Sequence, residues 1–455
     1  MRAMWCAGVL AVSSLASGAG DPPDPQCGSV IFIHPDGASA ATWAVARAML
    51  VGPDGDLNWD RLPHIAVYRG HMADSLTATS NGGATTHAFG IKVGSDAFGR
   101  TDGGEDGREI VDGDGNSLSV AHQAMRAGIP VGLVQTGIAS EPGTACFVSS
   151  VASRGEHDEI CAQLVESGIP VLLSGGERYF LPSGVQGVHG AGTRKDSRDL
   201  VEEAKAAGYT VVYTRGQLLS LPADCRRVLG LFAWNHTFND RPEEELAARG
   251  LPLYEPDAPT VGEMTKVAIR LLAAQGEQFF LVVEEEGTDN FGNNNNASGT
   301  IEAMRRADQA FGVASWYLQF RPDTLILTAA DSDGGGMRMR GIPVSDSEPI
   351  PSALPPRAPN GAPIDGVEGT GGRPFMAAPD RNGRSLPFGV VWSTTEDVSG
   401  GVLVRAAGLN ANLVKGSMDN TELAQLMRLT LFGRTIPVSG LVADDASRSS
   451  SPALR

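Results

Sequence analysis

The sequence predicts an α/β fold with a mainly parallel central sheet and helices on both faces of that sheet. Two observations carry this prediction. Short β-branched runs alternate with helical segments along most of the 455 residues, and 42% of the residues are hydrophobic, enough for a large buried core. In sheets of this kind ligands bind beyond the carboxyl ends of the strands, so candidate functional residues are expected there.

The predicted strands share a short apolar run, bounded by polar residues, Gly or Pro. They are residues 29–33, 131–134, 171–173, 210–213, 228–231, 279–283 and 324–327. The predicted helices share longer segments of helical composition, at residues 38–50, 118–127, 261–274 and 300–320. Their alternation predicts one α/β domain over residues 21–442.

Two segments depart from this alternation. Residues 334–387 are rich in Gly and Pro, including Pro349-Ile350-Pro351, and predict a long loop or insertion near the site. Residues 443–455 begin with a small, polar stretch and predict a disordered tail.

The first 20 residues are typical of an export signal. Met1-Arg2 gives a short positive start, residues 3–16 are mostly apolar, and Ser17-Gly18-Ala19 offers a cleavage site. The stretch is too short to span a membrane, and a frayed helix is the alternative. We therefore expect an exported protein, periplasmic or secreted. Four cysteines would then remain, able to form two disulfides in any of three pairings: Cys27, Cys146, Cys161 and Cys225.

The charge balance excludes one class of partner. The chain has 36 Lys and Arg against 53 Asp and Glu, a formal net charge of −17. Such an acidic protein is not expected to bind nucleic acid through a basic face. A small anionic substrate is still compatible, because one pocket can differ in sign from the whole surface. No later segment has 18 uninterrupted apolar residues, so no membrane span is expected.

Acidic residues follow three of the predicted strands. Asp36 follows the first, residues 284–289 (EEEGTD) follow the strand at 279–283, and Asp331 follows the strand at 324–327. Each alone has an ordinary explanation: a helix N-cap, a solvated loop and a Gly-rich turn. Their repetition at three strand ends predicts a polynuclear cation site with oxygen ligands.

A cluster of small hydroxyl residues at 79–86 (TSNGGATT) precedes a predicted turn at Gly90. A serine that leads into a helix, such as Ser80, could expose its hydroxyl and share the positive helix start with an anion. The alternative is that this serine only caps the helix.

The order of these motifs resembles that of alkaline phosphatases, from about Ser29 to Phe432. Supporting segments are residues 173–176, 229–233, 259–265, 280–289 and 328–331. The resemblance implies that Ser80 is the nucleophile and that Arg154 binds phosphate. It also implies zinc and magnesium as cofactors, and it leaves a homodimer open. The metal ligands that it implies are Asp36, shared between a zinc and the magnesium, Thr144 and Glu284 on the magnesium, and Asp289 and Asp331 on the zincs.

The chain departs from the family pattern at four positions. Thr79 stands where the family has Asp, and Asn293, Ser332 and Val398 stand where it has zinc-binding His. No His follows His236, so a small misalignment cannot restore them. We expect Asn293 and Ser332 as metal ligands, and an oxygen-only ligand set suits magnesium, calcium or manganese.

Two interpretations of this loss stay open. The site is either weakened and metal-poor, or rebuilt around harder cations, with Asp333 or Glu286 as further ligands. Glu285 and Glu286, beside Glu284, favour rebuilding. Three histidines are interpreted as packed or surface residues rather than ligands: His34, His87 and His236.

The predicted function is a secreted, metal-dependent phosphomonoesterase that acts through a phosphoserine and takes a small phosphorylated substrate. The alternatives are a degenerate relative that binds phosphate or cations without turnover, and a phosphodiesterase or sulfatase-like hydrolase on the same fold.

Overall fold

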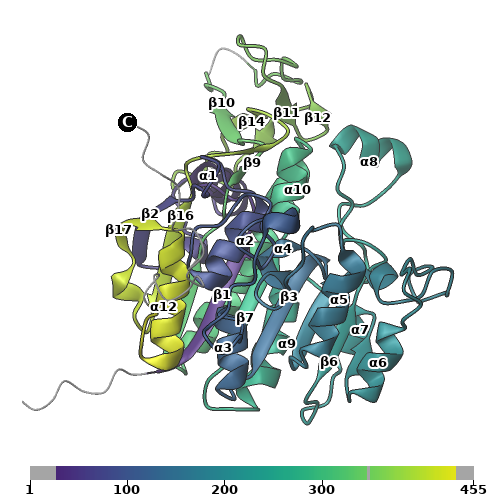
Figure 1. Cartoon of the computed structure of the whole chain (residues 1–455). Helices are drawn as coiled ribbons and strands as arrows, with labels where there is room; N and C mark the ends of the chain where they lie inside the picture. The colour runs from purple at the N-terminus through teal and green to yellow at the C-terminus, as the bar shows by residue number, and fades with distance from the viewer. Residues whose placement is uncertain (1–26, 346–348, 437–455) are drawn as a thin grey trace, which may run out of the picture.

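The structure is a computed structural model that describes residues 27–345 and 349–436. Its centre is a ten-stranded sheet (Figure 1), which confirms the predicted α/β class. The order across the sheet is β17 (Lys415–Asp419), β2 (His64–Arg69), β16 (Leu403–Gly408), β8 (Thr324–Thr328), β1 (Ser29–Pro35), β7 (Phe280–Glu285), β3 (Val131–Ile138), β4 (Val171–Gly175), β6 (Val228–Leu231) and β5 (Thr210–Val212).

The middle of this sheet is parallel. β1 pairs in parallel with β7 and β8, and β7 pairs in parallel with β3, so these four strands end at the same edge. β16 runs antiparallel to both of its neighbours. Every residue of β1, β3, β7 and β8 is buried, as their apolar sequences predict for strands covered on both faces.

Helices cover both faces of the sheet. Four helices lie on one face: α2 (Ser80–Phe89), α3 (Val120–Arg126), α4 (Pro142–Ala145) and α12 (Thr421–Phe432). α2 contacts the other three, and α3, α4 and α12 contact the central strands. α9 (Val261–Ala273) and α11 (Ala297–Leu318) pack together on the other face. α9 begins with a capping box between Thr260 and Glu263, which satisfies backbone groups at the helix start.

The remaining helices connect strands or cover the edges. They are α1 (Ala40–Leu50), α5 (His157–Glu166), α6 (Leu200–Ala206), α7 (Arg215–Leu219), α8 (Glu243–Arg249) and α10 (Gly287–Asn293).

The Gly- and Pro-rich segment, for which the sequence predicts a long loop or insertion, forms a second, antiparallel sheet. It stands at the top of Figure 1 and contains β10 (Arg338–Gly341), β11 (Ile364–Gly366), β12 (Gly369–Thr370), β13 (Phe375–Met376) and β14 (Pro387–Val391). Phe388, Val390 and Trp392 are buried beside Ala297 and Ile301 of α11. This small apolar cluster explains why so short a set of strands is ordered against the main domain.

A two-stranded sheet connects this segment to the main domain. β9 (Asp333–Gly334) pairs with β15 (Asp397–Val398) directly after Asp331 and Ser332. The second sheet is thereby attached at the carboxyl end of β8.

The predicted signal at 1–20 and the predicted tail at 443–455 lie outside the described residues. Cys146, Cys161 and Cys225 are buried thiols without a disulfide partner in the described chain, so the two bridges considered above are not formed. None of the helices in residues 27–345 and 349–436 combines the length and apolar character needed to cross a membrane.

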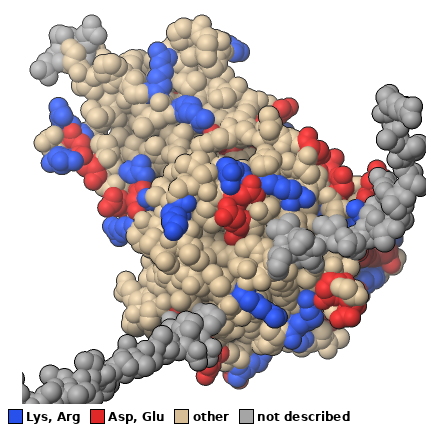
Figure 2. All heavy atoms as spheres, turned by 60° about the vertical axis from the view of Figure 1, so that its left-hand side comes forward, with Lys and Arg blue, Asp and Glu red and all other residues tan. Residues whose placement is uncertain are grey.

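The face that carries α12, β17 and β2 mixes charges of both signs. Figure 2 shows Lys and Arg there beside Asp and Glu, rather than gathered into a basic patch. For example, Lys92 Nζ lies 3.2 Å from Asp419 Oδ2.

Candidate active site

The acidic residues predicted from three strand ends meet at the carboxyl edge of the sheet. Asp36 follows β1, Glu284 lies in β7, Asp289 lies in the first turn of α10, and Asp331 follows β8. Ligand atoms of His34, Asp36 and Glu284 lie within 4.8 Å of one another, and so do those of Asp36, Glu286 and Asp289. Asp36 therefore belongs to both groups.

Asp36 is the centre of the cluster. It is fully buried, and neither carboxylate oxygen has a hydrogen-bond partner among the described residues. Its Oδ1 lies 3.4 Å from His34 Nε2. Burial acts to raise the pKa of Asp36, but His34, followed by Asp331 and Ser80, holds that pKa well below its ordinary value.

The pKa values of the other acids in the cluster are raised, not lowered. Burial, together with the charges of Asp36 and Glu141, raises the pKa of Glu284 to about 8. Burial and neighbouring acids also raise the pKa values of Glu286, Asp289 and Asp331 well above the ordinary range. These carboxyl groups cannot all be ionised together unless positive charge lies between them.

The residues of the cluster fit divalent cations. Both oxygens of Asp331 and one oxygen each of Glu284 and Glu286 are buried without a hydrogen-bond partner among the described residues. Buried carboxylates of this kind are costly unless paired or bound to a metal. Carboxylate and hydroxyl oxygens suit magnesium, calcium and manganese, and an imidazole adds affinity for transition metals.

Ser80 is the first residue of α2. The cap is supplied by Thr79, whose Oγ1 accepts a hydrogen bond from Gly82 N at 3.3 Å, so the Ser80 hydroxyl is not needed for capping. The Ser80 side chain neighbours Asp36 and contributes to its low pKa. This places a hydroxyl beside the acidic cluster and at a helix start, where an anion is favoured.

Glycine allows α2 to approach the cluster. A Cβ on Gly83 would lie 2.5 Å from Asp331 Cβ, which no real side chain tolerates. Gly37 has a φ of +65°, and a Cβ there would lie 2.5 Å from Asp289 Oδ1. Both positions require glycine for the observed packing.

Arg154 lies at the edge of the cluster and is half exposed. Its Nη2 donates to Glu141 Oε2 at 2.9 Å. Burial acts to lower the pKa of Arg154, but the charges of Glu141, Glu286 and Asp36 raise it. The guanidinium is thus a fixed positive charge close to the acids.

Thr144 lies in α4, beside Glu284. Gln135 Nε2 donates to Thr144 Oγ1 at 3.5 Å and also to Glu284 Oε2. A Cβ on Gly143 would collide with the Glu284 carboxylate, so α4 is packed directly against this acid.

Asn293 presents its amide nitrogen to the acids. Nδ2 donates to both oxygens of Asp289 and, at 3.0 Å, to Asp397 Oδ1. Its carbonyl oxygen accepts from Gly335 N at 2.8 Å, which fixes the orientation of the amide. Ser332 Oγ is buried without a hydrogen-bond partner in the described chain. In this arrangement Ser332 offers a free oxygen, and Asn293 offers N–H groups.

Sequence reasoning gave little weight to His34 and did not consider Asp397. Asp397 lies in β15 and reaches the cluster through pairing with β9, a contact between distant segments that no local signal reveals. The only local signal for His34 is its position two residues before Asp36, which the sequence does single out.

The side chains of the neighbouring residues Glu285 and Glu286 lie in different sites. Glu285 Oε1 accepts from Tyr254 OH at 2.8 Å and from Thr136 Oγ1 at 3.0 Å, in a separate hydrogen-bonded site. Only Glu286 joins Asp36 and Asp289. The prediction that Glu285 adds a further acid to the site is therefore wrong.

Comparison with known proteins assigns the whole arrangement to one family. The sequence profile of alkaline phosphatase matches residues 28–432. The chain is 29% identical over 348 residues to the repressible alkaline phosphatase of Saccharomyces cerevisiae, covering 68% of this chain and 55% of that protein. It is 27% identical over 340 residues to the membrane-bound alkaline phosphatase of Bombyx mori, covering 67% and 60%. The aligned region thus spans little more than half the length of these relatives.

Solved structures show the same fold. The alkaline phosphatase from the Antarctic bacterium TAB5 superposes with a TM-score of 0.65 at 20% identity, covering 89% of this chain and 98% of that one. The alkaline phosphatase of Thermus thermophilus gives a TM-score of 0.65 at 22% identity, with coverage of 92% and 96%.

Proposed function

Because the chain belongs to the alkaline phosphatase family, we propose that it is a secreted, metal-dependent phosphomonoesterase that acts through a phosphoserine at Ser80. Membership of the family confirms the resemblance inferred from the sequence. The observation that carries the proposal is the position of Ser80, at a helix start and beside the buried acid Asp36.

Divalent cations are part of the proposal. A mutant of the TAB5 alkaline phosphatase has been solved with Mg bound. In this chain the expected ligands are the buried acids Asp36, Glu284, Asp289 and Asp331, with Thr144 and Ser332. When bound, such cations would neutralise the acids, favour the ionised Ser80 hydroxyl and offset negative charge on the leaving oxygen.

The reaction would proceed in two displacements. Ser80 Oγ attacks phosphorus, the bond between phosphorus and the ester oxygen breaks, and the alcohol leaves with a proton. Water then attacks the phosphorus of phosphoserine, the bond to Oγ breaks, and the proton returns to serine. The N-terminus of α2 favours the phosphate charge in both steps.

Arg154 would hold the substrate. Its planar guanidinium can donate two parallel hydrogen bonds to phosphate oxygens. The ion pair with Glu141 orients it at the edge of the cluster without burying it. This leaves the guanidinium accessible to a small phosphorylated substrate.

The side chain of Asn293 favours a second candidate function, the binding of phosphate or a cation without turnover. An amide that donates to both oxygens of Asp289 supplies part of the compensation that a cation would otherwise give. A protein with this feature could bind phosphate or a cation without turnover. The two functions differ in whether any ester is hydrolysed.

The test compares three esters with the chelated protein before and after addition of Mn²⁺, Mg²⁺, Zn²⁺ or Ca²⁺. The esters are p-nitrophenyl phosphate, bis(p-nitrophenyl) phosphate and p-nitrophenyl sulfate. We expect metal-dependent release from the monoester, reduced by about 10³-fold or more in Ser80→Ala. Ser75→Ala, which removes the hydroxyl of a half-buried serine five residues upstream, is the matched control and should retain activity.

Other outcomes would replace the proposal. Release from only the diester or the sulfate supports the alternative hydrolases, and no release from any ester with any metal supports binding without turnover. Export is tested separately, by N-terminal sequencing of the mature protein from cells that express the full chain. An intact residue 1 would contradict it.

A further inference from the structure

We infer that His34, through Nε2, and Glu286, through a carboxylate oxygen, are ligands of divalent cations, one in each of the two groups that share Asp36. The inference deepens the proposed function, since it concerns the same cluster, but it predicts metal binding and not turnover. Neither His34 nor Glu286 belongs to the ligand set that the family resemblance implies.

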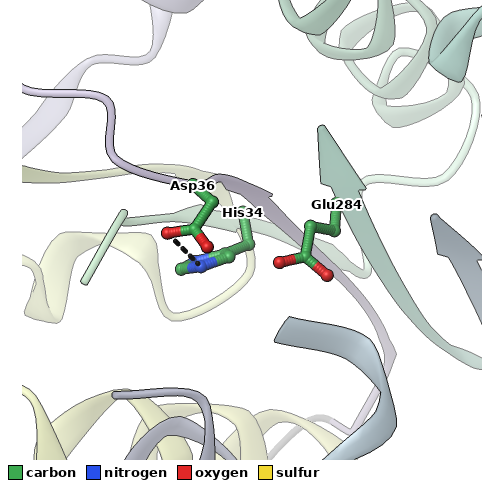
Figure 3. A group of neighbouring side chains, drawn as sticks. All are labelled: His34, Asp36 and Glu284. Carbon is green, nitrogen blue, oxygen red and sulfur yellow. Dashed lines mark ion pairs between the residues drawn. The ribbon is translucent and has the colours of Figure 1, made fainter. Parts of the chain in front are cut away.

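His34 is oriented as metal-binding histidines usually are. Its Nδ1 lies 2.8 Å from the backbone oxygen of Ala329, which accepts the Nδ1 proton. This contact leaves Nε2 facing Asp36, and a second partner that fixes the ring orientation is typical of a metal ligand. Figure 3 shows the imidazole between the carboxylates of Asp36 and Glu284.

The contact between His34 and Asp36 is longer than an ordinary charge-assisted hydrogen bond. The His34 Nε2 to Asp36 Oδ1 distance is 3.4 Å, whereas charge-assisted hydrogen bonds are usually about 2.7–2.9 Å. Nε2 and both Asp36 oxygens are buried without hydrogen-bond partners among the described residues. Three possible ligand atoms of these two residues are thus buried together, none of them occupied by a hydrogen bond within the described chain.

Glu286 completes the second site. It lies at the turn between β7 and α10, with only 2% of its surface exposed. Its Oε2 has no hydrogen-bond partner in the described chain, and a ligand oxygen of Glu286 lies within 4.8 Å of those of Asp36 and Asp289. An ionised carboxylate that is buried and faces two others without a bond of its own is costly unless a positive charge lies between them.

The two sites differ in the chemistry of their ligands. The site of Asp36, Glu286 and Asp289 offers only carboxylates, which suit magnesium, calcium or manganese. The site of His34, Asp36 and Glu284 adds an imidazole nitrogen, which favours manganese, iron, cobalt or zinc over magnesium. The oxygen-only set expected from the sequence therefore applies to one site and not to the other.

The experiment uses Mn²⁺, which both sites can accept. The purified chain is chelated, loaded with Mn²⁺, and analysed for bound metal by equilibrium dialysis and elemental analysis. We expect two Mn²⁺ per chain, one for each group. His34→Gln and Glu286→Gln should each remove one of the two ions. His122→Gln and Glu285→Gln are the matched controls and should retain both.

Pulsed electron paramagnetic resonance gives a second readout on the unmodified protein. A bound imidazole nitrogen modulates the Mn²⁺ electron spin echo, and a shared carboxylate couples the two ions magnetically. We expect nitrogen modulation in the wild type and in Glu286→Gln, and its loss in His34→Gln. Magnetic coupling should be present in the wild type and absent from both variants.

These measurements can overturn the inference even if a variant does not fold. Absence of nitrogen modulation from the wild type would show that His34 is not a ligand. A single bound ion in the wild type would show that the groups of His34 and Glu286 are not two cation sites. If both sites bind Mn²⁺ as expected but no phosphate ester is hydrolysed, the proposed function fails while this inference stands.

Discussion

Asn293 Nδ2 donates hydrogen bonds to both carboxylate oxygens of Asp289, at 3.1 and 2.9 Å. The two residues are four apart in sequence, at opposite ends of α10, so the helix itself aligns them. The amide is held in this orientation by Gly335 N. A neutral side chain thus stabilises one acid of the cluster in the absence of a cation.

We predict that Asn293→Asp makes the folded protein depend on metal. The new carboxyl group would face Asp289 and Asp397, and the lost hydrogen bonds would cost about 1–3 kcal/mol of unfolding free energy. The chelated Asn293→Asp variant should therefore unfold at a temperature several degrees below that of the chelated wild type. Added Mn²⁺ should raise the unfolding temperature more than it does for the wild type, and an equal rise would contradict the prediction.

Arg154→Lys should weaken substrate binding. Lysine keeps the positive charge but cannot donate two parallel hydrogen bonds to a phosphate. We expect KM for p-nitrophenyl phosphate to rise by about tenfold, or about 1.4 kcal/mol, with a smaller change in kcat. Arg338→Lys, which affects an arginine paired with Asp333, is the control. An unchanged KM would remove Arg154 from the phosphate site.

Gly143→Ala should displace Glu284. The added Cβ would collide with the Glu284 carboxylate, so either α4 or that acid must move. We expect a loss of about 1–3 kcal/mol in stability and a weaker affinity for Mn²⁺. Gly341→Ala is the control, because a Cβ there has open space. Measured Mn²⁺ affinity that is the same in both variants would contradict the prediction.

The metal-free protein should lose stability as the pH rises. Burial and neighbouring charges raise the pKa of Glu284 from 4.5 to about 8, so the folded state binds a proton that the unfolded state has released over this interval. Stability from this group is present below pH 4.5 and is lost as the pH rises through 8. Burial acts to lower the pKa of His34, but Asp36 raises it to about 10, so His34 acts in the same direction at higher pH.

The measurement is thermal unfolding of the chelated chain between pH 5 and 9, repeated with Mn²⁺. The difference between the two unfolding temperatures should widen with pH, because the ion compensates the ionised acids. Glu284→Gln should flatten the pH dependence of the chelated protein. A chelated chain that gains stability over this range would show that the acids are not crowded as described.

Much of the fold was predictable because its signal is local. The apolar runs of β1, β7 and β8 are continuous, which is typical of strands buried on both faces, and a parallel sheet follows from their alternation with helices. The second sheet was not predictable. Its strands are as short as two residues, and they are stabilised by contacts such as those of Phe388 with the apolar cluster beside α11.

The amino-acid sequence by itself determined that acids follow three strands and that a serine begins a helix, because strand ends and helix starts are fixed by neighbouring residues. Only the tertiary structure decided which side chains share the cluster. His34 and Asp397 belong to the cluster although no local signal places them there. Glu286 lies in the cluster and Glu285 lies in a separate site. The amide nitrogen of Asn293 faces Asp289. The physical reason is that strand register, side-chain direction and hydrogen-bond orientation depend on partners that lie up to hundreds of residues away.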